Sequence, residues 1–264
     1  MRVSISRVEK NGKITLQESG GIAIVTIHRP AAKNAMTANM WKELAALGKR
    51  IPKNEKTRVV ILRGAEGLFT AGSDIKEFNR MSIDEANESF GYMEEAISTF
   101  EEIELPTVGV ISGPAMGAGF ELALACDLRI GTPRTKMGMP IGRLGITLSK
   151  SFVKRIVDLI GPSKMKDLVY TGRLLNPVEC RDWGLVNYLL DEDTNADNYA
   201  ISLANIIKEQ SPASLRAAKE SAAFANSRLD IPLKSTFEKS AHPVDFPEGV
   251  RAFVEKRKPN FQSR

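Results

Sequence analysis

With 264 residues, the chain is long enough to bury a sizeable core in one domain with a short extension. Its 42% hydrophobic and 26% charged residues are typical of a globular protein, and no apolar run is long enough to cross a bilayer, which excludes a membrane protein. The net charge of +5 is not concentrated in a basic stripe with interleaved aromatic residues, so nucleic-acid binding is not indicated. Two isolated cysteines and an N-terminus without the apolar core of a signal peptide predict a cytoplasmic protein with reduced thiols.

Four short strands and several helices are expected along the chain. β-Branched runs, each followed by Gly or Pro, predict strands at 22–27, 59–62, 107–111 and 128–130. Helical segments lie between them, among them 40–50, 83–102 and 120–126, and further helices are expected at 200–210, 212–226 and 231–240. Because strands that alternate with helices pair in parallel, the pattern predicts an α/β layered fold.

A first turn of small residues follows the strand at 59–62. Residues 68–78 read LFTAGSDIKEF, and Ser73 or Asp74 is placed to cap a helix that begins near Ile75. Taken alone, Asp74 is better explained as an ordinary helix N-cap than as a functional residue. The backbone of this turn is nevertheless open to a ligand, because Ala71 and Gly72 carry almost no side chain.

A second turn of the same kind follows the strand at 107–111. Residues 113–121 read GPAMGAGFE, and the helix that follows leaves a free backbone N–H near Ala118 and a carboxylate at Glu121. An enzyme needs such groups to hold a developing oxyanion and to move a proton beside it. If the two turns converge on one carbonyl oxygen, they form an oxyanion hole with two donors.

Both turns resemble signatures of the enoyl-CoA hydratase/isomerase (crotonase) family. Residues 69–78 are similar to F-x-A-G-x-D-I-K-E, and residues 113–128 are similar to G-x-x-x-G-x-G-x-E-L-x-x-x-C-D. Segments 27–36 and 248–261 also match in order, so the resemblance covers nearly the whole chain. It implies an α/β fold with a ββα spiral core and acyl-CoA site in 1–195, and a helical C-terminal region in 196–264 that forms homotrimers or hexamers.

The resemblance also implies roles for individual residues. The oxyanion donors fall on the backbone amides of Ser73 and Ala118, and the first catalytic glutamate falls on Glu121. Substrate and coenzyme A contacts fall on or near Lys33, Ala71, Asp74, Ile75, Gly117, Ile141, Ser149, Phe253 and Lys256, the last two where a neighbouring subunit's tail touches the nucleotide. The implied partner is an acyl-CoA thioester. No metal and no cofactor other than the coenzyme A of the substrate are expected.

One position departs from the hydratase pattern. The hydratases carry a second glutamate in a segment of the form F-G-x-P-E, and here that segment is M-G-M-P-I, with Ile141 at the acid position. An isoleucine cannot orient water or deliver a proton, so a two-glutamate hydration is not expected. The glycine-rich turn that follows in the family is replaced by bulkier residues at 146–152, which would reshape the acyl pocket.

Two residues could replace the missing acid. Ser149 lies near where some relatives place a functional aspartate, but it also suits a helix N-cap. His242 is the other candidate, because imidazole is a common acid/base group in enzymes, although a lone histidine before proline is more often a packing or surface residue. Three functions remain open: a hydratase or isomerase with Glu121 as its main acid/base; a CoA-thioester hydrolase, decarboxylase or C–C lyase on the same scaffold; and a weakly catalytic acyl-CoA binding protein.

Overall fold

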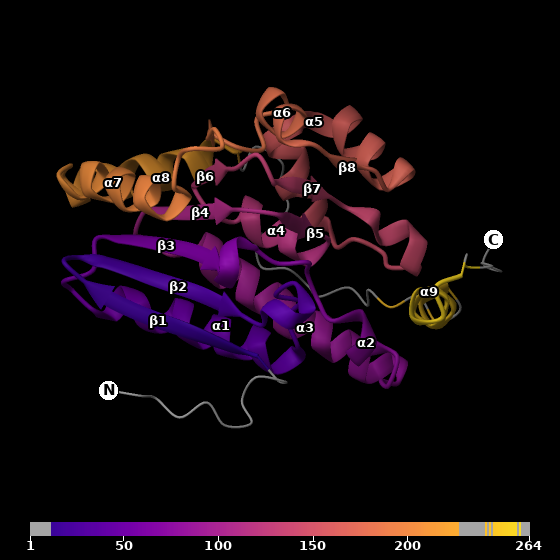
Figure 1. Cartoon of the computed structure of the whole chain (residues 1–264). Helices are drawn as coiled ribbons and strands as arrows, with labels where there is room; N and C mark the ends of the chain where they lie inside the picture. The colour runs from indigo at the N-terminus through magenta and orange to yellow at the C-terminus, as the bar shows by residue number, and fades with distance from the viewer. Residues whose placement is uncertain (1–11, 227–240, 242, 244, 258, 260–264) are drawn as a thin grey trace.

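The computed structural model describes residues 12–226, 241, 243, 245–257 and 259, and Figure 1 shows its arrangement around one main sheet. The six strands follow the spatial order β1-β2-β3-β4-β6-β9. Their bounds are Lys13–Ser19, Ile22–His28, Val59–Gly64, Thr107–Ile111, Leu128–Gly131 and Tyr188–Leu189. The four predicted strands are confirmed, and β2, β3, β4 and β6 pair in parallel as expected. The edge strand β1, which pairs antiparallel with β2, was not predicted.

Helices cover both faces of this sheet. Ala23, Val25 and Ile27 of β2 point into a core shared with α1 (Ala38–Arg50) and α3 (Ile83–Glu101). Alternate residues of β3 and β4 point to the other face, where Ala200 of α7 (Ala196–Lys208) packs. Because successive strand side chains alternate between faces, burial on both sides explains the nearly continuous apolar runs of these strands.

A smaller, three-stranded sheet begins within the second turn. Its strands are β5 (Pro114–Met116), β7 (Lys136–Gly138) and β8 (Leu174–Leu175). Four helices connect or flank the two sheets: α2 (Ile75–Phe78), α4 (Ala118–Leu124), α5 (Lys150–Thr171) and α6 (Pro177–Asp182). The predicted helix at 120–126 is therefore confirmed with a start two residues earlier.

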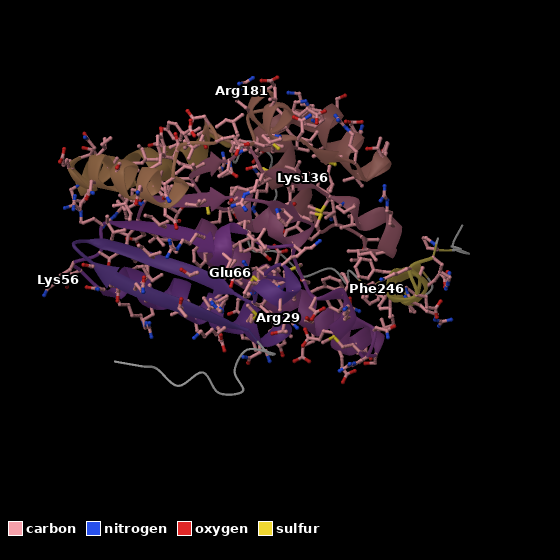
Figure 2. All side chains as sticks on the ribbon, in the orientation of Figure 1. Arg29, Lys56, Glu66, Lys136, Arg181 and Phe246 are labelled. Carbon is pink, nitrogen blue, oxygen red and sulfur yellow. The ribbon has the colours of Figure 1, made fainter. Side chains whose placement is uncertain are left out.

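The C-terminal part is helical where it is described. It comprises α7, α8 (Pro212–Asn226) and α9 (Asp245–Val254), and α9 packs against α2 and the short turn Pro140–Leu144. Phe246 projects from α9 toward the body of the molecule (Figure 2) and contacts Phe78 and Phe90 at ring-centroid distances of 5.5 and 5.7 Å. The predicted helix at 231–240 and His242 lie outside the described residues. The division at residue 195 stays a prediction.

None of the described helices combines the length and the apolar character that a membrane span requires.

Candidate functional site

A cavity of about 640 Å³ opens where the two small-residue turns meet α3 and the segment after β7. This volume lies in the range that small-molecule and cofactor sites occupy. The lining residues come from both turns, the loop after β2, the 139–152 segment and the end of α9: Arg29, Ala31, Ala32, Lys33, Ala35, Ala71, Ser73, Asp74, Ile75, Lys76, Phe78, Phe90, Met93, Glu94, Met116, Gly117, Ala118, Met139, Pro140, Ile141, Leu144, Ile146, Thr147, Leu148, Phe152 and Phe253.

Ser73 and Ala118 both line this cavity. Ser73 forms a parallel bridge with Met36, in which Met36 N donates to Gly72 O and Asp74 N donates to Met36 O. Because the C=O and N–H of one trans peptide group point in opposite directions, and Gly72 O faces Met36, the Ser73 N–H is directed away from Met36. Among the described residues, no group accepts a hydrogen bond from Ser73 N or Ala118 N.

Close approach of the two turns depends on Gly72. Its φ of +91° is a conformation that side chains disfavour, and a Cβ on Gly72 would lie 2.4 Å from the Met116 carbonyl oxygen and 3.4 Å from Ala118 N. The Ser73 side chain is also held by Trp41, whose Nε1 donates to the Ser73 Oγ at 3.1 Å. The structure therefore brings the two predicted donors together across Gly72.

Three cationic side chains among the described residues line the cavity. They are Arg29, Lys33 and Lys76, and Arg29 pairs with Asp74 at 2.8 Å. The Asp74 side chain also accepts from Lys76 N at 3.0 Å, so the predicted N-cap of α2 is confirmed. Lysine and arginine side chains in a cavity wall are suited to phosphate groups, whereas phenylalanine, methionine and aliphatic side chains make up much of the remaining lining.

Glu121 is completely buried in α4, and it is not among the described residues that line the cavity. Its Oε2 accepts from Arg155 Nη1 at 2.9 Å, while Oε1 has no hydrogen-bond partner in the described part of the chain. Arg155 also donates to both carboxylate oxygens of Glu101, at 3.0 and 2.6 Å. Burial raises the pKa of Glu121 to about 8, and the guanidinium of Arg155 only partly offsets this effect.

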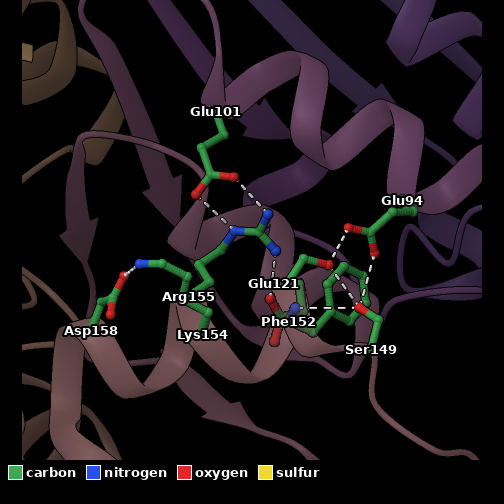
Figure 3. A network of polar contacts seen from close by, with 9 residues as sticks. Glu94, Glu101, Glu121, Ser149, Phe152, Lys154, Arg155 and Asp158 are labelled. Atoms are coloured by element: carbon green, nitrogen blue, oxygen red, sulfur yellow. Dashed lines mark hydrogen bonds and ion pairs between the residues drawn. The ribbon is translucent and has the colours of Figure 1, made fainter. Parts of the chain in front are cut away.

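A different carboxylate, Glu94 of α3, faces the cavity. Sequence reasoning missed it. The Ser151 hydroxyl donates to its Oε1 at 2.6 Å and the Ser149 hydroxyl lies 3.4 Å from its Oε2 (Figure 3). Glu94 is 6% exposed, and burial raises the pKa of its carboxyl despite the two hydroxyls and Arg155 nearby.

A signal for Glu94 existed in the sequence. The apolar face of α3 includes Phe90, Met93, Ile97 and Phe100, and position 94 belongs to the same face, four residues after Phe90 and three before Ile97. An acidic residue on an apolar helical stripe is exceptional, because buried carboxylates are costly unless they are paired.

The remaining predicted residues divide into two groups. Ala71, Ile75, Gly117, Ile141 and Phe253 line the cavity, and Ile141 occupies the wall where the hydratase pattern would place an acid. Two predicted residues do not line it: Ser149, which caps α5 by accepting from Phe152 N, and Lys256, which is exposed after α9. In the part of the chain that the structure describes, no group of His, Cys, Asp and Glu side chains could hold a metal ion.

Comparison with known proteins identifies the family to which this chain belongs. The model of a family described as enoyl-CoA hydratase/isomerase matches residues 17–264. The chain is 32% identical to a short-chain-enoyl-CoA hydratase of Clostridium acetobutylicum, over 93% of this chain and 95% of that protein. It is 31% identical to the human mitochondrial methylglutaconyl-CoA hydratase, over 93% of this chain and 75% of that protein.

Solved structures agree with the sequence comparison. A crystal structure of an enoyl-CoA hydratase/carnithine racemase from Magnetospirillum magneticum matches with a TM-score of 0.77 and 30% identity, covering 95% of this chain and 96% of that one. An enoyl-CoA hydratase from Bacillus anthracis matches with a TM-score of 0.75 and 28% identity, covering 95% and 99%. The predicted α/β crotonase fold is confirmed. The chain is an enzyme of the enoyl-CoA hydratase/isomerase family.

Proposed function

We propose that this enzyme moves protons on the acyl chain of an acyl-CoA thioester, and that it isomerises a double bond instead of adding water. The thioester oxygen accepts hydrogen bonds from Ser73 N and Ala118 N, which stabilises the enolate. Ser73 and Ala118 line one cavity, and no described residue accepts a hydrogen bond from either amide, which supports this role. Loss of one such donor typically costs about 3–4 kcal/mol of transition-state stabilisation.

The preference for isomerisation follows from Ile141. Hydration requires one group to activate water and another to protonate the α-carbon, whereas isomerisation requires a single base that returns the proton it removes. The cavity wall is apolar at Ile141, and this observation carries the proposal. The family resemblance assigns the acid/base role to Glu121, whose side chain is buried and is not among the described residues that line the cavity.

The ligand follows from the shape and charge of the cavity. Lys33 and Lys76 suit the phosphates of coenzyme A, and the apolar side chains of the lining suit an acyl chain. Coenzyme A enters as part of the substrate, and no further cofactor is proposed. We also propose a homotrimer or hexamer, which would cover exposed apolar side chains such as Tyr170, Leu174 and Val178. A cytoplasmic location stays a prediction, since the human relative is named mitochondrial.

A comparison of two reactions tests the proposal. Purified enzyme is mixed with but-3-enoyl-CoA, and formation of the conjugated isomer is followed; crotonyl-CoA is tested separately for hydration. We expect isomerisation to be clearly faster than hydration, and an Ile141→Glu variant to gain hydratase activity. Rapid hydration by the unmodified enzyme would contradict the proposal. Release of free coenzyme A would favour a hydrolase, decarboxylase or lyase, and binding without any product would favour an acyl-CoA binding protein.

A further inference from the structure

We infer that Glu94, and not Glu121, is the catalytic residue that takes the proton from the bound acyl chain and returns it. This inference rests on the proposed function and assigns its acid/base group. Glu94 and Glu121 are both buried, and of these two glutamates only Glu94 is among the described residues that line the cavity. A proton-transfer group must come within hydrogen-bond reach of the atom it serves, so access to the cavity is the first requirement.

Glu94 lies close to the pair of oxyanion donors. Its neighbour Met93 contacts Ser73, with the sulfur 3.6 Å from Ser73 Oγ, and both Met93 and Ser73 line the cavity. On its other side Glu94 meets Ser149 and Ser151 at the start of α5. Glu94 therefore lines the cavity with its carboxylate bound at the start of α5, and the preceding residue contacts the turn that carries Ser73.

The surroundings of Glu94 suit a base. Burial raises the pKa of its carboxyl, which makes the carboxylate a stronger proton acceptor. The hydroxyls of Ser151 and Ser149 and the positive charge of Arg155 counteract burial, so the ionised form keeps partners inside the protein. Two further acidic groups lie in the same neighbourhood, Glu101 and Glu121, and Glu101 favours the protonated form of Glu94.

Glu121 is held away from the cavity by its partners. Arg155 binds its Oε2, and the guanidinium carbon of Arg155 lies 5.4 Å from the centre of the Phe152 ring. Phe152 itself lines the cavity, whereas Glu121 is not among the described residues that do, and Figure 3 draws Glu121 bound to Arg155 and Glu94 bound to Ser149. A carboxylate that does not line the cavity and is bound to a cation is less suited than Glu94 to take a proton from an acyl carbon. We assign Glu121 to the buried charge network with Arg155 and Glu101.

The chemical step balances without another reactant. A Glu94 carboxylate oxygen takes a proton from the carbon next to the thioester carbonyl, and the C–H electron pair becomes the C=C bond of an enolate. The negative charge moves to the thioester oxygen, where Ser73 N and Ala118 N donate to it. In a but-3-enoyl thioester the proton returns to the terminal carbon of the conjugated system, the double bond moves by one position, and Glu94 is again ionised.

Deuterium exchange isolates this step. Butyryl-CoA, which cannot isomerise, is incubated with the enzyme in D₂O, and incorporation of deuterium beside the carbonyl is measured by mass spectrometry as a function of pH. The variants are Glu94→Gln, Glu121→Gln and Glu95→Gln, the last an exposed glutamate on the same helix that serves as the matched control. Circular dichroism and butyryl-CoA binding check that each variant is folded.

We expect Glu94→Gln to lower the exchange rate at least about 100-fold with butyryl-CoA binding retained. Glu121→Gln should lose less than Glu94→Gln, and Glu95→Gln should match the unmodified enzyme. Exchange that survives in Glu94→Gln, or a larger loss in Glu121→Gln, overturns the inference and leaves the proposed function intact. Absence of exchange in the unmodified enzyme overturns the proposed function itself, and the inference with it.

A Ser151→Ala variant keeps the inference testable if Glu94→Gln does not fold. Removal of the hydroxyl takes away a hydrogen bond that lowers the pKa of Glu94, so the pH at which exchange is half-maximal should rise. A purely structural role of Glu94 would leave this midpoint unchanged, and an unchanged midpoint overturns the inference.

Discussion

Glu121 illustrates how burial changes the meaning of a residue that a motif identifies. The motif predicts a carboxylate beside the expected oxyanion donors, and Glu121 does lie in the first turn of α4, three residues after Ala118. Its own carboxylate is directed to Arg155, whose guanidinium is already bound by both oxygens of Glu101. Arg155 therefore neutralises Glu121 incompletely, and one oxygen of the buried carboxyl stays without a partner among the described residues.

This arrangement predicts a pH-dependent stability. The pKa of Glu121 rises from 4.5 to about 8 in the folded chain because burial disfavours its charge. The folded state therefore binds this proton more tightly than the unfolded state, and its contribution to stability falls as the pH rises from about 4.5 to about 8. A Glu121→Gln variant, which cannot ionise, should lose less stability over this range than the unmodified chain. Urea unfolding at pH 6 and pH 9 measures both. Equal losses would contradict a raised pKa for this buried carboxyl.

At the residue scale, sequence reasoning located two turns that meet at the cavity and missed a side chain whose contacts are distant in the chain. The family resemblance implies Ser73 and Ala118 as donors, and both line the cavity. Glu94 lies in a helix with many acidic residues, and its position on the apolar face of that helix was overlooked. Its burial depends on Ser149 and Ser151, which lie more than 50 residues later in the chain. No local pattern joins these residues.

At the level of elements, the buried parallel strands were the easiest to predict. β4 is completely buried and its predicted bounds are correct, because a short β-branched run can pack on both sheet faces. β1 was missed because its seven residues are half-buried or exposed and mix charged with apolar side chains. Predicted helix ends differ by a few residues; α7 begins at Ala196 instead of 200, since Asn195 supplies an N-cap.

The docking of α9 gives a prediction at this scale. Phe246 is 2% exposed and packs against Phe78 of α2 and Phe90 of α3, while Phe253 of the same helix lines the cavity. Replacement of Phe246 by Ala should weaken this docking by about 3–5 kcal/mol, the usual cost of a buried phenylalanine. Hydrogen exchange of α9 amides should accelerate, and acyl-CoA affinity should fall because Phe253 leaves the cavity. Unchanged exchange in α9 would show that other contacts hold the helix.

On the scale of the whole molecule, the cavity lies where the main sheet meets the smaller sheet. The parallel sheet brings β3 and β4 side by side, so the turns that follow them converge at the same edge. Met116 of the smaller sheet, Phe152 of α5 and Phe253 of α9 then complete the lining of the cavity. The sequence could predict this order of strands and turns, whereas the fit of the 139–152 segment over α3 required the assembled fold.

The vibrational frequency of the bound thioester carbonyl tests the central claim most directly. Butyryl-CoA labelled with ¹³C at the carbonyl carbon is bound to the enzyme, and its C=O stretch is isolated by infrared difference spectroscopy against unlabelled ligand. Donation by Ser73 N and Ala118 N should polarise the bond and lower its frequency below that of free butyryl-CoA in water. A frequency equal to that of the free thioester would contradict the oxyanion hole, and with it the proposed chemistry.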